Sequence, residues 1–333
     1  MTSSELLQTP VVAGPLDPAA PPAVPSKPAA LPATPTEYHH FLRTPRNRWW
    51  KGVLAIVSLV VGYVIVSVVL GQVAMIIDTA TGRTTWQMYA SGEFTVTPMM
   101  FLALNLSLAA LTPLALLLQW AFYGQRPRWL SSVQGGFRWR WFGRAALIVV
   151  PIWVVFVAVA YLLKPELIGR LSADATVLLI IVLLTTPLQA AGEEYGYRGL
   201  INRAAASWSA NPKVGLVIGI VVSSTLFMLA HGASDPWLLV SYFVVGAALA
   251  VMAWRTGGLE VPVLVHMVNN VLLLAPGVLF GDLAQLFNRG PGAGGPILLV
   301  PMILFIAVIA GIEWWRRRSG VARRSISAEV SHV

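Results

Sequence analysis

The sequence predicts an all-α, polytopic membrane protein with about eight transmembrane helices, and two observations support this class. Hydrophobic residues make up 56% of the 333 positions and charged residues only 11%, whereas soluble domains carry about 25% charged residues. Apolar stretches also recur along the chain, and about 20 apolar residues are enough to span a bilayer as a helix. Too little polar surface is therefore available to cover a water-exposed globule.

Eight apolar segments follow a Pro-rich beginning. We expect spans at about 52–77, 98–122, 145–163, 175–206, 214–231, 237–254, 259–280 and 297–315. The fourth segment is strongly apolar only as far as Ala191, and we extend it because the polar stretch behind it keeps helix-forming residues. An even number of spans puts both ends of the chain on the same side of the membrane.

Composition divides the chain into three regions. Residues 1–46 contain ten prolines and many alanines, so they cannot build a core, and we expect a disordered cytoplasmic tail. Residues 47–318 form the eight-span membrane domain, and residues 319–333 form a basic cytoplasmic tail. The chain has no cysteine, which excludes disulfides, thiolate metal sites and a cysteine nucleophile.

The distribution of Lys and Arg sets the expected orientation. Eighteen of them flank the spans on the side of the two chain ends, and four lie on the other side: Arg83, Lys164, Arg170 and Arg289. The positive-inside rule therefore predicts that both termini are cytoplasmic. The net charge of +9 is spread over every inner loop, so we expect membrane lipid and no nucleic acid as a partner. Nineteen of the 23 basic residues are Arg, which suggests a GC-rich bacterial genome and hence the plasma membrane.

The few polar residues inside the spans indicate where a functional site lies. Each ionisable group there costs roughly 2.5–3.5 kcal/mol on insertion scales, so such groups indicate functional sites. Among the acidic residues only Glu193 and Glu194 interrupt an apolar segment, and of the five histidines only His231 and His266 belong to spans. Together with Arg198 they form the predicted set of buried ionisable groups.

Sequence spacing relates these residues to one another. Glu194 and Arg198 are four apart and share a helix face, which favours an ion pair; this pair is read as structural support for the site. His266 and Asn270 are also four apart, so one helix presents an imidazole and an amide together. Phe227 lies one turn before His231 and is expected to pack beside it.

The chemistry of these groups suits hydrolysis. A carboxylate in a low-dielectric site acts as a general base on water near neutral pH, and a neighbouring histidine can orient that water. A second imidazole and an amide N–H supply donors for a developing oxyanion. A metal is the open alternative: Glu193, His231 and His266 would suit zinc with one free position.

These residues also carry a resemblance to a known family. Glu193-Glu194 with Arg198 resembles the EExxxR motif of the CPBP family of CAAX proteases and bacteriocin-processing (Abi) membrane proteins, which includes the type II CAAX prenyl endopeptidases. Phe227 and His231 resemble its FxxxH motif, and His266 with Asn270 its HxxxN motif. The three motifs occur in the family's order, and the similarity covers about residues 175–275.

The resemblance implies an intramembrane endopeptidase, and it implies a role for each matching residue. Glu193 would activate water with help from His231, while His266 and Asn270 would hold the oxyanion. Glu194, Arg198 and Phe227 would shape and support the site. The family is often called a metalloprotease, while a metal-free glutamate mechanism has also been proposed for it, so no cofactor is certain and zinc stays possible. The substrate would be a membrane-associated peptide or protein.

Two other classes of function fit the same polar residues. The first is a non-catalytic membrane module that binds a partner or confers peptide immunity. The second is a small transporter with a buried proton relay, which the absence of an inverted repeat disfavours. Glu166, Asp235 and Glu260 are read as solvated loop residues, Asn269 is left out of the site, and Gly246 is assigned to close packing.

If the spans are taken as straight helices of bilayer length, the residues of the three motifs lie at different depths in the membrane. His231 falls near the outer end of the fifth span, while Glu193 approaches the inner end of the fourth. They meet only if the fourth helix runs well beyond Arg198 and the turn at 232–236 is recessed into the membrane. We therefore predict both features, together with a water-filled cavity, because irregular backbone at that depth needs one.

Overall fold

The computed structural model describes residues 29–91, 96–163, 171, 173–280 and 287–325. Within these ranges it contains eight helices long and apolar enough to cross a membrane, which confirms the all-α polytopic class. The first three spans are α1 (Trp49–Ala80), α3 (Pro98–Ala109) continued by α4 (Leu111–Tyr123), and α5 (Trp139–Leu163). The later spans are α6 (Ala175–Glu193) with its extension, α8 (Pro212–Ala230), α9 (Pro236–Thr256), α10 (Glu260–Phe280) and η5 (Pro296–Leu298) with α12 (Leu299–Ser319). The short helices η1 (Tyr38–His40), α2 (Trp86–Ser91) and η2 (Pro127–Leu130) lie outside the spans.

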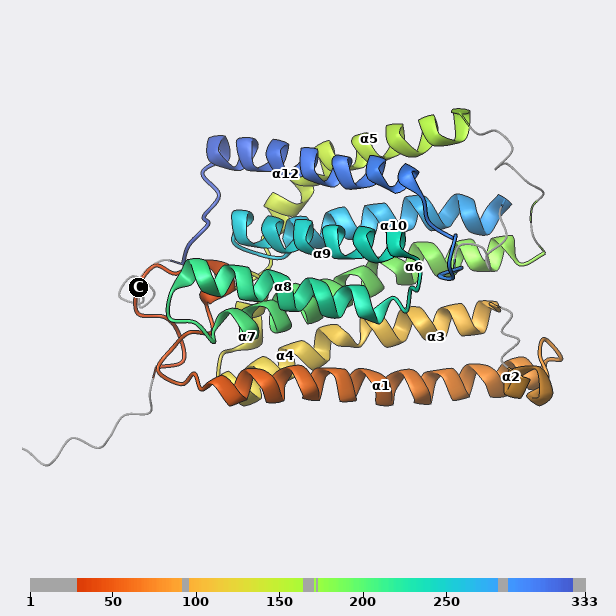
Figure 1. The fold of residues 1–333 in the computed structure, drawn as a ribbon, viewed down its shortest axis with the longest axis horizontal. Helices are drawn as coiled ribbons and strands as arrows, with labels where there is room; N and C mark the ends of the chain where they lie inside the picture. The colour runs from red at the N-terminus through yellow and green to blue at the C-terminus, as the bar shows by residue number, and fades with distance from the viewer. Residues whose placement is uncertain (1–28, 92–95, 164–170, 172, 281–286, 326–333) are drawn as a thin grey trace, which may run out of the picture.

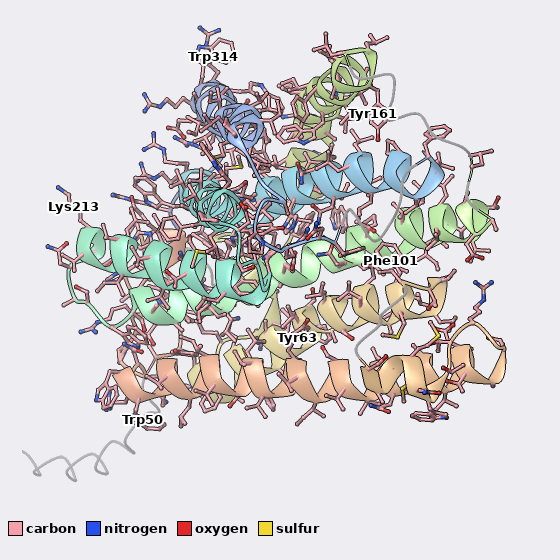
Figure 2. The ribbon with its side chains drawn as sticks, turned by 45° about the vertical axis from the view of Figure 1, so that its right-hand side comes forward. Trp50, Tyr63, Phe101, Tyr161, Lys213 and Trp314 are labelled. Atoms are coloured by element: carbon pink, nitrogen blue, oxygen red, sulfur yellow. The ribbon has the colours of Figure 1, made fainter. Side chains whose placement is uncertain are left out.

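The spans run roughly parallel to one long axis, and Figure 1 shows them stacked across that axis. Aromatic and basic residues gather towards one end, where Figure 2 labels Trp50, Lys213 and Trp314. Side chains on the outside of the bundle are large and apolar, such as Ile65 and Leu147, which are 58% and 77% exposed. An apolar exterior of this kind is what a lipid environment stabilises.

The fourth span is a long helix, as we predicted from the need to bring Glu193 and His231 to the same depth in the membrane. It comprises α6, a π-helical segment η4 (Glu194–Ile201) and α7 (Asn202–Ala206), and together these cover Ala175–Ala206. The predicted span of 175–206 is therefore confirmed. A π-helical turn has the wider i→i+5 hydrogen-bond pattern and occurs frequently at functional sites. Here it holds the residues from Glu194 to Arg198.

Glycine allows close helix packing at two places in the bundle. A Cβ atom added to Gly192 would lie 2.0 Å from the carbonyl oxygen of Leu108, so α6 can approach α3 this closely only because Gly192 lacks a side chain. On α9, a Cβ at Gly246 would lie 3.1 Å from Cα of Ser224 on α8. The assignment of Gly246 to close packing agrees with this geometry.

The turn between α8 and α9 lies well inside the length of the bundle, which agrees with the second feature predicted from the depths of Glu193 and His231. Figure 1 shows α8 and α9 ending part-way along the length of α1 and α10, well short of the far end of the molecule. The segment 287–295 folds onto this turn: the backbone N–H of Ser234 donates to the carbonyl of Arg289 at 2.9 Å, and that of Gly292 donates to Asp235 at 2.9 Å. Irregular backbone at this depth is thus paired within the protein.

Two acidic residues assigned to solvated loops are in fact buried. The side chain of Asp235 caps the first turn of α9 through the N–H groups of Trp237 and Leu238. Glu260 is fully buried and forms a bidentate ion pair with Arg138 at 2.9 and 2.7 Å. The expectation of solvation was wrong for both, because the loops that carry them pack against other elements. Glu166 lies outside the described residues.

The end of the Pro-rich region is ordered. Tyr38, Phe41 and Leu42 are buried, and the backbone of Thr36 pairs with Ser325 through two hydrogen bonds of 3.0 Å. Glu37 receives hydrogen bonds from the Trp254 indole at 2.9 Å and Arg323 at 2.7 Å. The expected tail at 1–46 therefore differs from the structure at residues 36–42, where aromatic and acidic side chains supply contacts that Pro and Ala lack. Residues 1–28 of that tail and 326–333 of the C-terminal one lie outside the described residues.

Two arginines counted among the basic residues of the inner side lie inside the protein: Arg198, which the sequence also predicts to be buried, and Arg203, for which burial is not predicted. Arg198 is 1% exposed and belongs to the candidate site described below. Arg203 is fully buried and donates to Gln119 at 2.8 Å, to the carbonyl of Trp129 at 3.2 Å and to Gln125 at 3.3 Å. The long fourth helix carries both side chains into the bundle, so they do not contribute to the positive surface.

Candidate functional site

Four ionisable side chains from two helices meet in the interior. Glu194 Oε1 accepts hydrogen bonds from Arg198 Nη1 at 2.8 Å and from His266 Nδ1 at 2.7 Å. Glu193 Oε2 lies 3.1 Å from the other ring nitrogen of His266, Nε2. The long helix supplies both glutamates and the arginine, while α10 supplies the histidine. All four are at most 6% exposed, which places this cluster deep in the protein.

His266 is held between the two glutamates. Each ring nitrogen faces one carboxylate, and an imidazolium with two N–H donors satisfies both contacts. Two carboxylates, one guanidinium and one imidazolium then give a cluster without net charge, which lowers the cost of burying ions in a membrane. The Glu194–Arg198 ion pair agrees with the prediction from spacing. The contact between Glu194 and His266 was not anticipated.

His231 approaches the cluster from the end of α8. Its Nδ1 lies 2.7 Å from the carbonyl oxygen of Phe227, so Nδ1 carries the hydrogen and Nε2 is the free acceptor in the neutral ring. The ring stacks on Tyr242 of α9, with centroids 3.9 Å apart. Phe227 contacts both histidine rings, with centroids 4.6 Å from His231 and 6.0 Å from His266. His231 and Glu193 also interact electrostatically, although they form no direct ion pair among the described contacts.

Asn270 belongs to the same site, but it bonds to Gln189 and not to His266. Its Nδ2 donates to Gln189 Oε1 at 3.2 Å, and Gln189 Nε2 donates to Glu193 Oε2 at 2.8 Å. Gln189 lies one helical turn before Glu193 and joins the HxxxN helix to the glutamate. The structure thus brings together all the residues of the three motifs: Glu193, Glu194, Arg198, Phe227, His231, His266 and Asn270.

Three tyrosines lie near the site, none of them at a defining position of the three motifs. Tyr63 of α1, Tyr197 of η4 and Tyr242 of α9 lie within electrostatic range of the Glu193 carboxylate. Figure 2 labels Tyr63 on α1, well away from both ends of that helix. Sequence reasoning missed these tyrosines because Tyr is common in membrane helices. Gln189 did leave a signal, since it is a polar residue four positions before Glu193 in an apolar run.

The donor arrangement bears on a possible metal. Among the described residues, no group of three or more His, Cys, Asp or Glu side chains is arranged to hold a metal ion. The predicted set of Glu193, His231 and His266 therefore does not form a ready three-ligand group in this arrangement. Both ring nitrogens of His266 are already directed at carboxylate oxygens. The residues present thus fit a hydrogen-bonded cluster better than a zinc centre with three protein ligands.

Comparisons with known proteins identify the region that carries the site. A family model described as type II CAAX prenyl endopeptidase Rce1-like matches residues 174–272. An uncharacterized 24.3 kDa protein of Escherichia coli is 31% identical over 145 residues, which are 42% of this chain and 62% of that protein. The match thus spans less than two thirds of that relative's length. No solved structure matches the chain significantly.

Proposed function

We propose that this chain, whose residues 174–272 belong to the Rce1-like family of type II CAAX prenyl endopeptidases, is an intramembrane endopeptidase. Its substrate would be a membrane-associated peptide or protein, hydrolysed at a site enclosed by α6, η4, α8, α9 and α10. The observation that carries the proposal is the contact of Glu193 with His266 at 3.1 Å, with the His231 ring, whose Nε2 is an acceptor, in electrostatic range of Glu193. This arrangement combines a general base, a water-orienting group and buried N–H donors.

In the proposed reaction Glu193 removes a proton from water while His231 Nε2 orients that water. The resulting hydroxide attacks the peptide carbonyl, and the negative charge develops on the carbonyl oxygen. Once Glu193 holds the proton, its hydrogen bond from His266 Nε2 weakens, so this N–H becomes available to the oxyanion. Asn270 Nδ2 has a second hydrogen beyond the one given to Gln189. Glu193 then returns its proton to the leaving amine.

Glu194 and Arg198 support this reaction without contacting the substrate in our scheme. Their ion pair holds the His266 ring in place, because Nδ1 of the ring lies 2.7 Å from Glu194 Oε1. A second hydrogen bond, from Arg198 Nη2 to the carbonyl of Gly246 at 3.3 Å, attaches this support to α9. We expect a plasma-membrane protein of bacterial type, with both termini in the cytoplasm.

Peptide cleavage by the purified protein in lipid vesicles tests the proposal. The probes are a farnesylated CAAX peptide and a mixture of hydrophobic peptides, with products detected by mass spectrometry. Glu193→Gln and His231→Ala are each expected to lower the rate about 10²–10⁴-fold, the usual contribution of a general base. Asp174→Asn is the matched control, because this carboxylate pairs with Arg83 outside the site and its loss should leave cleavage unchanged.

Other outcomes favour other functions. Peptide binding without cleavage by the wild-type protein would support the non-catalytic module instead. Equal activity of the wild type and Glu193→Gln would contradict the role assigned to Glu193. Whether the reaction needs a metal is tested separately. The metal content of the purified protein is measured, and its activity is measured with a chelator before and after zinc is added. Restoration by zinc alone would overturn the metal-free scheme.

A further inference from the structure

A chain of amide groups extends from Glu193 to the far side of α10. Gln189 Nε2 donates to Glu193 at 2.8 Å, and Asn270 Nδ2 donates to Gln189 at 3.2 Å. Asn269 Nδ2 donates to Asn270 Oδ1 at 3.0 Å, and the indole Nε1 of Trp153 donates to Asn269 Oδ1 at 3.2 Å. The chain thus links α5, α10 and α6 through four consecutive hydrogen bonds.

The chemistry of its two ends sets the direction of every bond. The Trp153 indole is only a donor, so Asn269 must present its oxygen to it. An ionised Glu193 is only an acceptor, so Gln189 must present its NH₂ group to it. The amides between them then have one consistent orientation, in which each oxygen accepts and each nitrogen donates towards Glu193. A reversal of any one amide would leave donors facing donors.

We propose that Trp153, Asn269 and Gln189 are positioning residues that hold Glu193 and Asn270 in their working orientation. The proposal rests on the proposed peptidase function and adds three residues to its machinery. Hydrogen bonds in such a chain polarise one another, so the indole N–H at one end strengthens the bond that Gln189 gives to Glu193. The same chain fixes which hydrogens of Asn270 remain for an oxyanion.

The surroundings of Trp153 suit this role. The side chain is fully buried in α5 and packs edge-to-face against Phe305, with ring centroids 5.4 Å apart. Gln189 is 6% exposed, so water does not readily replace it. Packing therefore holds the indole ring in place, while its N–H has one specific acceptor. The ring and the N–H can be separated experimentally, because phenylalanine keeps an aromatic ring and removes the donor.

Trp153→Phe is the decisive variant, and Trp141→Phe is its matched control. Trp141 lies on the same helix, is 4% exposed, and its Nε1 has no hydrogen-bond partner among the described residues. Steady-state cleavage kinetics of the full-length protein in vesicles should show kcat about 5- to 20-fold lower for Trp153→Phe with KM unchanged. Trp141→Phe should keep wild-type kcat and KM. A kcat effect without a KM effect is expected for groups that act only in the transition state.

Asn269→Asp supplies an independent test with almost the same side-chain volume. It replaces the NH₂ group that faces Asn270 by an oxygen, so it breaks the chain at its centre and should lower kcat at least as much as Trp153→Phe. Wild-type kcat in both variants, alongside an inactive Glu193→Gln, would overturn the positioning role and leave the peptidase intact. Equal losses of kcat and thermal stability in Trp153→Phe and Trp141→Phe would also overturn it, because packing alone would then explain them. Absence of cleavage by the wild type would count against the proposed function itself.

Discussion

At the scale of single residues, His266 shows how the protein tolerates charge in an apolar interior. One imidazole faces Glu193 and Glu194 at 3.1 and 2.7 Å, and Arg198 supplies the second positive charge at 2.8 Å from Glu194. Each group would be costly to bury alone, and the four together need no counter-ion. The cluster is therefore expected to be stable only when all four charged side chains are present.

Arg198→Met tests this dependence. The variant leaves the buried cluster with one uncompensated negative charge, because two carboxylates then share one imidazolium, so it should destabilise the protein by about 3–5 kcal/mol. Glu194→Gln combined with Arg198→Met removes one charge of each sign and should be milder than Arg198→Met alone. Thermal unfolding in detergent, followed by circular dichroism, measures both. A double variant at least as unstable as the single one would show that charge balance does not determine stability here.

At the scale of elements, the site depends on helices of unequal length. The long fourth span carries Glu193 into the interior of the bundle, and the shorter α8 ends at Ala230, directly before His231. The π-helical segment keeps Glu194 and Arg198 paired while the helix continues to Ala206. The close approach of α6 to α3 occurs at Gly192, one residue before Glu193.

Gly192→Ala should disturb this contact between α6 and α3. Its Cβ would lie 2.0 Å from the carbonyl oxygen of Leu108, so the two helices must separate at a cost of about 1–3 kcal/mol, the usual range for overpacking. Glu193 follows directly, so cleavage should also fall. Gly71→Ala is the control, because nothing lies within 4 Å of its added Cβ. Thermal unfolding and cleavage are measured on both variants. Equal stability and equal cleavage rates for Gly192→Ala and Gly71→Ala would contradict this explanation.

At the scale of the whole molecule, the described ends of the chain lie on one side of the bundle. Thr36 and Ser325 pair with each other, as an even number of spans requires. The strongly basic inner loops lie on this side, although Arg198 and Arg203 are buried and do not add to that surface. That this side faces the cytoplasm stays a prediction of the positive-inside rule.

Cysteine labelling measures this orientation directly. The natural chain has no cysteine, so each introduced thiol reports one position. Ala293→Cys in the loop before α12 should react with a membrane-impermeant maleimide on intact bacterial cells. Ala210→Cys in the loop before α8 should react only after the cells are permeabilised; both positions are exposed. The reverse pattern would invert the topology and place the termini outside.

The sequence by itself determined the membrane class, the eight spans and the identity of the motif residues. These follow from local properties: apolar runs of bilayer length, and a few polar side chains that are costly inside them. Only the tertiary structure decided what each polar group contacts, because those partners come from other helices. Glu194 bonds to His266 as well as to Arg198, and Gln189 joins Glu193 to Asn270. Burial of Glu260 and of the segment around Tyr38 likewise depends on neighbours distant in the chain, which no local pattern encodes.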